Sequence, residues 1–382
     1  MKRRVAIFRH DLLPLSETFI RSQAQALREW QPILLGYRRT PDGLSLDGLD
    51  HHLIAHQNGI IQRISGATRF WLHSPDHSAV SALRNLNVSL VHAHFGTDAT
   101  IIWPSVKAAG LPMLVTLHGF DINIHREWWE SGHGGLRGRV YPRRLLEMAQ
   151  DPAVHFIAVS NAVKECAIKY GIPENKVTVS YIGVDTDRFQ PAGLPIEKRK
   201  NRILFVGRMV EKKAPLIMIY AHSKIFDEIP DAELVMIGSG PLLPAAKQLA
   251  SRLGSNVTFL GACNSDQVLS ELHKARIFCL PSITSENGDA EGLPISILEA
   301  MSCGVPTITS ARGAADAIQN RTNGVLTKEG SISDLSINAV KILKDISLST
   351  SLSRTAASTI NQRFDIKHCT HSLQGIYNAH SH

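Results

Sequence analysis

The chain has 382 residues, of which 43% are hydrophobic and 20% are charged, and this ordinary globular composition excludes an intrinsically disordered chain. The formal net charge of +7 suits a phosphorylated ligand, a nucleic acid or an anionic membrane, but the chain has no basic block or aromatic RNA-binding signature, so nucleic acid is set aside. At about 150 residues per domain, the length predicts two domains with a cleft between them.

Short apolar runs with β-branched residues alternate with longer amphipathic runs through the first half of the chain. They predict strands at 5–8, 33–35, 90–92, 113–117, 156–159 and 177–181, with helices between them. Strands separated by helical crossovers are typical of a parallel sheet. The predicted fold class is therefore α/β.

At 184–201 the sequence becomes VDTDRFQPAGLPIEKRKN, which is rich in Pro, Gly and charge and has no periodicity, as in a linker. A second series of strands is predicted at 203–206, 234–237, 257–260, 277–280 and 307–309. The predicted organisation is a first Rossmann-like domain (1–185), a linker (186–200), a second Rossmann-like domain (201–364) and a C-terminal helix that packs back toward the first domain (365–382). Ligands of such sheets bind beyond the carboxyl ends of the strands, so the residues that follow each strand carry most weight.

The five cysteines are odd in number and widely spaced, unlike a disulfide framework or a zinc site, and favour a reducing cytoplasm. The opening MKRRVAIFRHDLLPL begins like a signal peptide, but Arg9, His10 and Asp11 interrupt its apolar stretch. No segment has 18 consecutive apolar residues. Any membrane contact is predicted to be peripheral, at the inner face of the cell membrane.

The segment SENGDAEGLPISILEAMSCG, residues 285–304, follows the predicted strand at 277–280. Pro294 suits the first turn of a helix, and Gly304 suits its end. Because Gly292 has no side chain, a diphosphate can approach the amino end of this helix, whose free N–H groups and dipole favour anions. Glu299 can then accept both hydroxyls of a ribose, and Glu291 can reach the transferred sugar. Taken alone, two glutamates at this spacing more often lie on a solvated surface helix.

The neighbouring motifs favour the functional interpretation. Glu291 and Glu299 form the E-x7-E signature of glycosyltransferase family 4, which the sequence resembles over nearly its whole length, and VGRMVEKKA resembles the family's G-R-x4-K segment. The resemblance implies a GT-B fold, a retaining mechanism and donor binding by the second domain. The donor residues carried over from it are Gly207, Arg208, Lys213, Gly238, Gly240, Gly292, Leu293, Pro294 and Glu299, with Glu291 as a catalytic residue.

An arginine fork and a lysine at a strand end suit the phosphates of a nucleotide sugar and the charge that develops on the leaving diphosphate. The glycines of IGSGP, residues 237–241, permit tight turns and close approach of the nucleotide. The sequence departs from the family at Ala214, where a glycine is usual, and at RGAAD, residues 312–316, where G-G-x-P-E is commoner.

VHAHFGTD places His92 and His94 two residues apart, so both side chains are predicted on one face of a strand. A metal site is conceivable, but no third ligand is near, and a packed or hydrogen-bonded pair is favoured. The segment resembles the H-x-H-F-G of exopolysaccharide transferases, which assigns His94 and Gly96 to the acceptor side. In TLHGFD, His118 resembles the family's cleft histidine, which contacts the donor sugar or polarises the reaction centre; the alternative is a histidine that bonds loop carbonyls.

PLSETFI predicts Ser16 as the N-cap of an amphipathic helix, and its SETFI matches a subgroup for bacterial surface polysaccharides, so Ser16 and Glu17 are assigned to the acceptor side. Asp185 and Asp187 form an Asp-x-Asp, but they lie in the linker and are interpreted as turn residues rather than metal ligands.

Residues 126–144, REWWESGHGGLRGRVYPRR, combine two tryptophans with arginines and glycines. They suggest a membrane-facing lid over a lipid-linked acceptor. The alternative interpretation, a packed tryptophan pair beside a flexible loop, explains this sequence equally well.

The predicted function is retaining transfer of a hexose from a UDP- or GDP-linked sugar to a hydroxyl of a lipid-linked saccharide in surface polysaccharide biosynthesis, with no metal or other cofactor. Two alternatives stay open. One is a sugar-nucleotide epimerase of the same architecture, and the other is a catalytically silent subunit that binds a sugar nucleotide.

Overall fold

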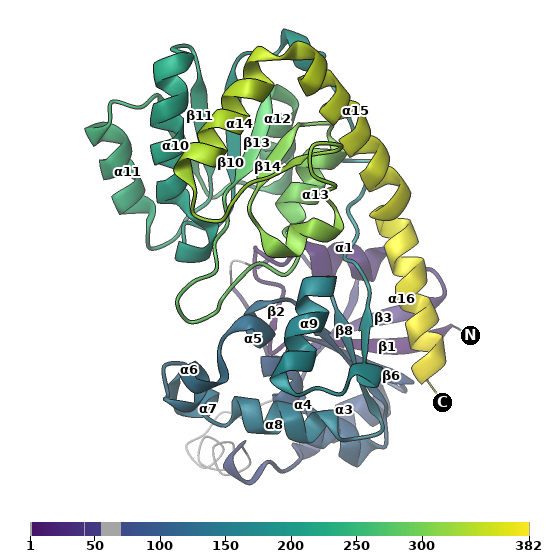
Figure 1. Ribbon diagram of the computed structural model, residues 1–382. Coiled ribbons are helices and arrows are strands. Elements are labelled where there is room, and N and C mark those ends of the chain that lie inside the picture. Colours follow the sequence, from purple (N-terminus) through teal and green to yellow (C-terminus); the bar gives the residue numbers. More distant parts are fainter. Residues whose placement is uncertain (1, 42, 55–69, 382) are drawn as a thin grey trace. The chain divides into compact units, whose positions relative to one another are not determined.

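The computed structural model describes residues 2–41, 43–54 and 70–381. The chain divides into two compact units, residues 1–183 with 366–382 and residues 184–365. Figure 1 shows that each unit gathers its strands into a sheet with helices around it. The fold class predicted from the sequence, α/β with two Rossmann-like parts, is confirmed.

The first unit is built on a seven-stranded parallel sheet in the order β5-β3-β1-β6-β7-β8-β9. Its strands are β1 (Arg3–Phe8), β3 (Trp30–Gly36), β5 (Asp50–Leu53), β6 (Leu90–His94), β7 (Met113–Leu117), β8 (Val154–Ala158) and β9 (Val177–Val179). Two short strands, β2 (Asp11–Leu12) and β4 (Arg38–Arg39), pair separately. Successive strands lead outward in opposite directions from β1 and β6, so the topological switch point of this sheet lies between those two strands.

The described helices of the first unit are α1 (Thr18–Ala26), α3 (His77–Asn85), α4 (Gly96–Ala109), α5 (Phe120–Asn123), α6 (Arg126–Glu130), α7 (Gly135–Gly138), α8 (Tyr141–Ala149), α9 (Asn161–Tyr170), the 3-10 helix η1 (Glu174–Lys176) and α16 (Ile366–His380). Side-chain caps fix the start of two of them. Asp76 accepts from the Ser78 N–H at α3, and Ser160 accepts from the Val163 N–H at α9.

The second unit has a six-stranded parallel sheet in the order β12-β11-β10-β13-β14-β15. Its strands are β10 (Arg202–Val206), β11 (Glu233–Ile237), β12 (Val257–Gly261), β13 (Ile277–Leu280), β14 (Thr307–Thr309) and β15 (Val325–Leu326). In chain order this is the 3-2-1-4-5-6 arrangement of a Rossmann fold, with its switch point between β10 and β13. That switch point is where the fold favours a ligand.

The helices of the second unit are η2 (Ile196–Lys198), η3 (Glu211–Lys213), α10 (Pro215–Glu228), α11 (Leu243–Arg252), α12 (Ser265–Lys274), α13 (Ile295–Ser302), η4 (Arg312–Asp316), α14 (Ile332–Lys344) and α15 (Ile346–Arg363). Helix α10 packs against α11 and α14, while α13 contacts β13, β14 and α15. The capping box of Asn264 and Gln267 starts α12.

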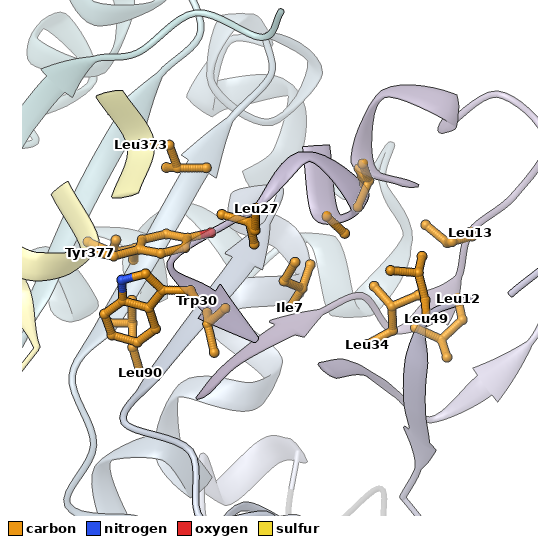
Figure 2. Packing of buried hydrophobic residues seen from close by; sticks show 14 of the residues in the cluster. Ile7, Leu12, Leu13, Leu27, Trp30, Leu34, Leu49, Leu90, Leu373 and Tyr377 are labelled. Atoms are coloured by element: carbon orange, nitrogen blue, oxygen red, sulfur yellow. The ribbon is translucent and has the colours of Figure 1, made fainter. Parts of the chain in front are cut away.

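One face of the first sheet is covered by α1 and α16. Val5 and Ile7 alternate along β1 toward this face, where they join Leu373 and Tyr377 of α16 in one buried cluster. Figure 2 shows Tyr377 beside Trp30, and the two rings meet edge to face at a centroid distance of 5.4 Å. Full burial of a leucine such as Leu373 stabilises the unit by about 2 kcal/mol. The end of the chain therefore belongs to the core of the first unit.

Each strand predicted from the sequence is present, with bounds that differ by up to three residues. Within the described parts of the chain, four short strands escaped prediction: β2, β4, β5 and β15. The sequence of β5 is DHHL, and most of its side chains are exposed, so it lacks the apolar alternation of a half-buried strand. Strands such as β15, with two residues, are too short to give a periodic signal.

The predicted N-cap of α1 is wrong. The helix begins at Thr18, its cap position is Glu17, and no side chain caps it. Ser16 lies inside a turn in which the Glu17 N–H donates to the Pro14 carbonyl over 2.9 Å. The turn places Ser16 one residue too early to serve the free N–H groups of the helix.

Candidate active site

The donor-side residues gather at the switch point of the second sheet. Strand β10 leads into Gly207, Arg208 and η3, and β13 leads into the loop that carries Glu291. Lys213, the last residue of η3, donates to Glu291, with Nζ and Oε2 separated by 2.8 Å. Two residues that the sequence analysis assigned to different parts of the donor therefore form an ion pair with each other.

Glu291 is a buried carboxylate among positive charges. Burial alone would raise its pKa, but the charges of Lys213, Lys212 and Arg208 and the hydrogen bond from Lys213 together hold that pKa below its ordinary value of 4.5. The group is therefore ionised at neutral pH. Arg208 is exposed and makes no ion pair or hydrogen bond through its side chain with any described residue, so its guanidinium is available to a ligand.

The glycines of the neighbouring loops allow backbone to pack on backbone. A Cβ at Gly238, where φ is +135°, would lie 1.9 Å from the Gly207 carbonyl oxygen. A Cβ at Gly240 would lie 2.6 Å from the Met209 carbonyl oxygen, and the Met209 N–H donates to Ser239 across the same gap. These glycines hold the loops after β10 and β11 together beside Arg208, a role that the motif letters did not reveal.

Helix α13 presents its amino end at the same place. It begins at Ile295, directly after Pro294, and no side chain caps it, so the prediction that Pro294 lies within the first turn is off by one residue. Ser296 donates through its hydroxyl to the Val206 carbonyl, which fixes the helix to the end of β10. Leu293 is buried beneath the turn. The uncapped N–H groups favour a negatively charged ligand.

Glu299 lies further along α13 and is half-buried. Burial raises its pKa to about 7, against a smaller opposing effect of the positive charge of Arg188. Its side chain forms no hydrogen bond with a described residue. A partly desolvated carboxylate with unused acceptor oxygens is suited to bind hydroxyl groups.

The loop at 312–316, in which the sequence departs from the family pattern, packs directly on the turn that carries Glu291. A Cβ added to Gly313 would lie 1.6 Å from the Gly292 carbonyl oxygen and 2.7 Å from that of Glu291. The first contact is impossible without movement of the backbone. Gly313 therefore fixes the position of the Glu291–Pro294 turn.

If the Glu291–Pro294 turn binds the donor, as the sequence predicts, Gly313→Ala should weaken donor binding by about 10-fold or more, because the methyl group must displace this turn. Isothermal titration with the nucleotide sugar measures the change. Gly375→Ala is the matched control, since a Cβ there meets nothing within 4 Å. Equal donor affinity in Gly313→Ala and wild type would contradict this account of the loop.

In the first unit, His92 and His94 lie on one face of β6, as their spacing predicted, with ring centroids 4.4 Å apart. His92 bonds Tyr377 and Thr116, and the Nδ1 of His94 lies 3.0 Å from the Nε2 of His118. Burial lowers the pKa of His92 to about 3 and holds those of His94 and His118 well below 6.5. All three rings are therefore neutral at physiological pH.

Asp121 is a site residue that the sequence analysis missed. Its carboxylate accepts hydrogen bonds from the N–H groups of Gly96, His118 and Gly119 at 2.8–3.0 Å. Burial raises its pKa to about 6 in spite of these bonds. The carboxylate thus fixes the loops after β6 and β7, and with them the His118 backbone. The aspartate that ends the motif TLHGFD was the feature of the sequence from which this residue could have been found.

The switch point of the first sheet holds a second charged cluster. Arg9 follows β1 and donates to Glu17, with Nε and Oε2 separated by 2.9 Å, and it also forms an ion pair with Asp98. Its guanidinium lies 4.4 Å from the centre of the Phe95 ring. Glu17 is 7% exposed and bound to Arg9, so it is a support of this cluster rather than an open acceptor group.

The sequence analysis offered two interpretations of Trp128 and Trp129, a membrane-facing lid and a packed pair, and the two side chains differ in how they fit them. Trp129 is 5% exposed and packs edge to face on Phe120 and Tyr141. Trp128 is half-buried and stacks on His133. Arg144 is also buried, where it bonds the Phe70 carbonyl. Trp129 and Arg144 therefore belong to the packed interior and cannot face a membrane.

Among the described residues, no group of three His, Cys, Asp or Glu side chains could hold a metal ion. The Asp-x-Asp pair is a turn, in which Asp185 accepts the N–H groups of Asp187 and Arg188. Within the same residues, no helix is long and apolar enough to cross a bilayer.

Comparison with known proteins identifies the family. A model of "Glycosyltransferase Family 4" matches residues 16–188, and a model of "Glycosyl transferases group 1" matches residues 186–359. The structure resembles the crystal structure of Anabaena HepE in complex with UDP and glucose, with a TM-score of 0.81 and 17% identity over 99% of this chain and 100% of that one. The chain therefore belongs to the family 4 glycosyltransferases, with a group 1 second half.

Two relatives are informative. A GDP-mannose-dependent monoacylated alpha-(1-6)-phosphatidylinositol monomannoside mannosyltransferase from Corynebacterium glutamicum is 33% identical over 43% of this chain, and the match spans about half of that relative, 46%. The Escherichia coli UDP-Gal:alpha-D-GlcNAc-diphosphoundecaprenol alpha-1,3-galactosyltransferase is 29% identical over 78% of each chain.

Proposed function

We propose that the protein transfers a hexose from a UDP- or GDP-linked sugar to a hydroxyl of a lipid-linked saccharide, with the anomeric configuration retained, in surface polysaccharide biosynthesis. The observation that carries this proposal is the group of charges at the switch point of the second sheet. Arg208, Lys213 and the amino end of α13 converge there on Glu291.

These charges suit departure of a nucleoside diphosphate. Negative charge develops on the leaving phosphate oxygen in the transition state, and nearby cations and helix N–H groups stabilise it. Arg208 offers the planar, forked set of N–H groups of a guanidinium, and Lys213 offers a compact positive charge. Glu299 accepts ribose hydroxyls, and Glu291 accepts hydroxyls of the transferred sugar. Since these charges neutralise the diphosphate, the proposal requires no metal or other cofactor.

The first unit supplies the acceptor side in this proposal. His118 is assigned to the reaction centre, and Ser16, His94 and Gly96 to the acceptor side. Glu17 belongs to the acceptor side as the residue that holds Arg9. The names of the two relatives support a nucleotide sugar as donor and a lipid-linked acceptor, because they specify GDP-mannose with a phosphatidylinositol mannoside and UDP-galactose with a diphosphoundecaprenol saccharide.

The decisive experiment offers the purified protein a panel of UDP- and GDP-sugars with lipid-linked saccharide acceptors, in the presence of EDTA. Mass spectrometry is expected to show one hexose added to the acceptor, and NMR of the product should show the anomeric configuration of the donor. Epimerised donor without acceptor would favour the epimerase. Tight donor binding with neither transfer nor hydrolysis would favour the silent subunit.

We also propose that the protein is cytoplasmic and touches the membrane peripherally through the exposed part of residues 126–144. Leu136 is 68% exposed, and Arg137, Arg139 and Arg143 are also exposed, while Trp128 is half-buried. Co-sedimentation with anionic vesicles is expected for wild type and reduced for a Trp128→Ala, Leu136→Ala variant. Equal co-sedimentation would refute this contact.

The raised pKa of Glu299 makes a prediction about donor affinity. The ionised carboxylate accepts both ribose hydroxyls, so affinity should rise with pH through about 7 and fall as the group is protonated below that value. Glu299→Gln should raise the donor KM about 10-fold at pH 8 and flatten this pH dependence. Glu228→Gln, which alters an exposed ion pair with Lys344, is the control. A wild-type pH profile in Glu299→Gln would contradict the assignment.

A further inference from the structure

The two lysines at the end of η3 are neighbours in sequence, but they occupy different environments. Lys213 lies over the end of β10, where its Cδ would be 3.3 Å from a Cβ at Gly207. Lys212 is 7% exposed, and its Nζ lies 2.9 Å from Asp289 Oδ1 and 3.8 Å from Glu291 Oε1. Only one of the two is assigned a task by the proposed function.

Lys212 is held in place from two directions. Its carbonyl oxygen accepts the N–H of Ile283, which ties η3 to the loop after β13. Its ammonium group is bound by Asp289, on the same loop as Glu291. A lysine that is buried and fixed in this way is not free to turn toward a ligand. Its charge therefore acts within the protein.

The charge of Glu291 has to be balanced when a donor arrives. In the structure, Lys213 is its hydrogen-bonded partner, while Glu291 Oε1 is buried and forms no hydrogen bond with a described residue. If Lys213 turns to the diphosphate, the buried carboxylate loses this partner. A buried charge without a counter-charge is strongly unfavourable. Lys212 is the cation that remains beside it.

We propose that Lys212 is a positioning residue, which balances the charge of Glu291 and fixes its loop while Lys213 engages the diphosphate of the donor. This proposal rests on the proposed function, since it needs Lys213 at the diphosphate. It divides the work between adjacent lysines: Lys213 exchanges partners during each reaction, and Lys212 does not.

The groups that face the Glu291 carboxylate are Lys212 and Lys213 from η3, Arg208 from the turn after β10, and Asp289 from its own loop. The 3-10 helix η4, which packs on Gly292, carries the charged residues Arg312 and Asp316 at its two ends. Removal of Lys212 takes away one of the two nearest positive charges and leaves the burial unchanged. The pKa of Glu291 must then rise.

The test compares Lys212→Met, Lys212→Arg and the double variant Lys212→Met, Asp289→Asn. The variants are made in the Glu299→Gln background, in which the pH dependence due to Glu299 is removed, and the wild-type limb is that of Glu299→Gln alone. In this background we expect Lys212→Met to lower kcat/KM for the donor about 30-fold and to move the acidic limb of the kcat/KM profile, which then reports Glu291, to higher pH. The arginine variant, which keeps the charge, should restore the limb. The double variant should keep the displaced limb, because it removes the lone Asp289 charge but not the need of Glu291 for a cation. Thermal unfolding of the arginine and double variants checks that they fold.

The outcomes separate this proposal from the proposed function. If Lys212→Met keeps the wild-type limb while Lys213→Met loses donor use, Lys212 has no such role and the proposed function stands. If the double variant regains the wild-type limb, Lys212 serves only Asp289 and the proposal falls. If Lys213→Met and Glu291→Gln both transfer at the wild-type rate, the donor site is not at these residues and this proposal falls, while the transfer activity stands. If wild type transfers no sugar to any acceptor of the panel, the proposed function fails, and this proposal fails with it.

Discussion

Lys213→Met is expected to lower kcat/KM for the nucleotide sugar by about 10²- to 10³-fold, which is the usual cost of removing one hydrogen-bonding group from a developing negative charge. Methionine keeps the length and the apolar stem of lysine, so it removes the charge with little change in packing. The loss should appear in steady-state kinetics as a lower kcat together with a higher KM for the nucleotide sugar. Part of the loss arises because Glu291, buried and bonded to Lys213 over 2.8 Å, is left with a more distant cation.

Lys224→Met is the matched control, since Lys224 is exposed on α10 and has no described partner. Its kinetics should equal those of wild type. If Lys213→Met retained the wild-type kcat/KM with normal thermal stability, the diphosphate would have to be held by other groups. Arg208 and the amino end of α13 would then be the candidates that remain.

The sequence predicted the position of this site better than its internal contacts. Parallel strands have apolar, β-branched runs that can be recognised without a structure, and residues that follow such strands must meet at one edge of the sheet. This reasoning brought Lys213 and Glu291 to the same edge. It could not show that they bond each other, because the partner of a long side chain depends on rotamers and loop paths that no periodicity encodes.

The neighbouring residues Lys212 and Lys213 are a second case in which the sequence does not predict the partners of a side chain. In the sequence, Lys212 and Lys213 are equivalent letters in VGRMVEKKA, and only the family spacing distinguished the second. The fold separates them, since 3-10 geometry points consecutive side chains in different directions. One of them reaches Glu291 beside the strand end, and the other is buried against Asp289.

Support residues were missed for a related reason. Arg9 and Asp98 come from segments 89 residues apart in the chain, and nothing in either segment indicates that the other will be near. Asp121 was visible in TLHGFD, but its three backbone hydrogen bonds depend on how the loops after β6 and β7 fold together. Residues that touch a ligand belong to motifs, whereas the residues that hold them belong to the tertiary structure.

His118→Ala is expected to lower kcat by about 10²- to 10³-fold, with a change of less than about threefold in the donor KM, if this histidine acts at the reaction centre. The structure restricts how it acts. His118 Nε2 is occupied by His94, so Nδ1 is the ring nitrogen that remains for a substrate. The ring is neutral, because burial and the charge of Arg9 hold its pKa well below 6.5. It therefore acts as a hydrogen-bonding group rather than as a cation.

The pH profile tests this protonation state independently of the rate. A group whose pKa is depressed in the folded protein loses its proton below the ordinary range, so wild-type kcat should show no inflection near 6.5 that disappears in His118→Ala. His125→Ala, a change at an exposed histidine, should leave both kcat and the profile unaltered. A loss in KM alone would make His118 a binding residue. An inflection near 6.5 confined to wild type would mean that the ring carries a charge during turnover, and that the histidine stack opens when the substrate binds.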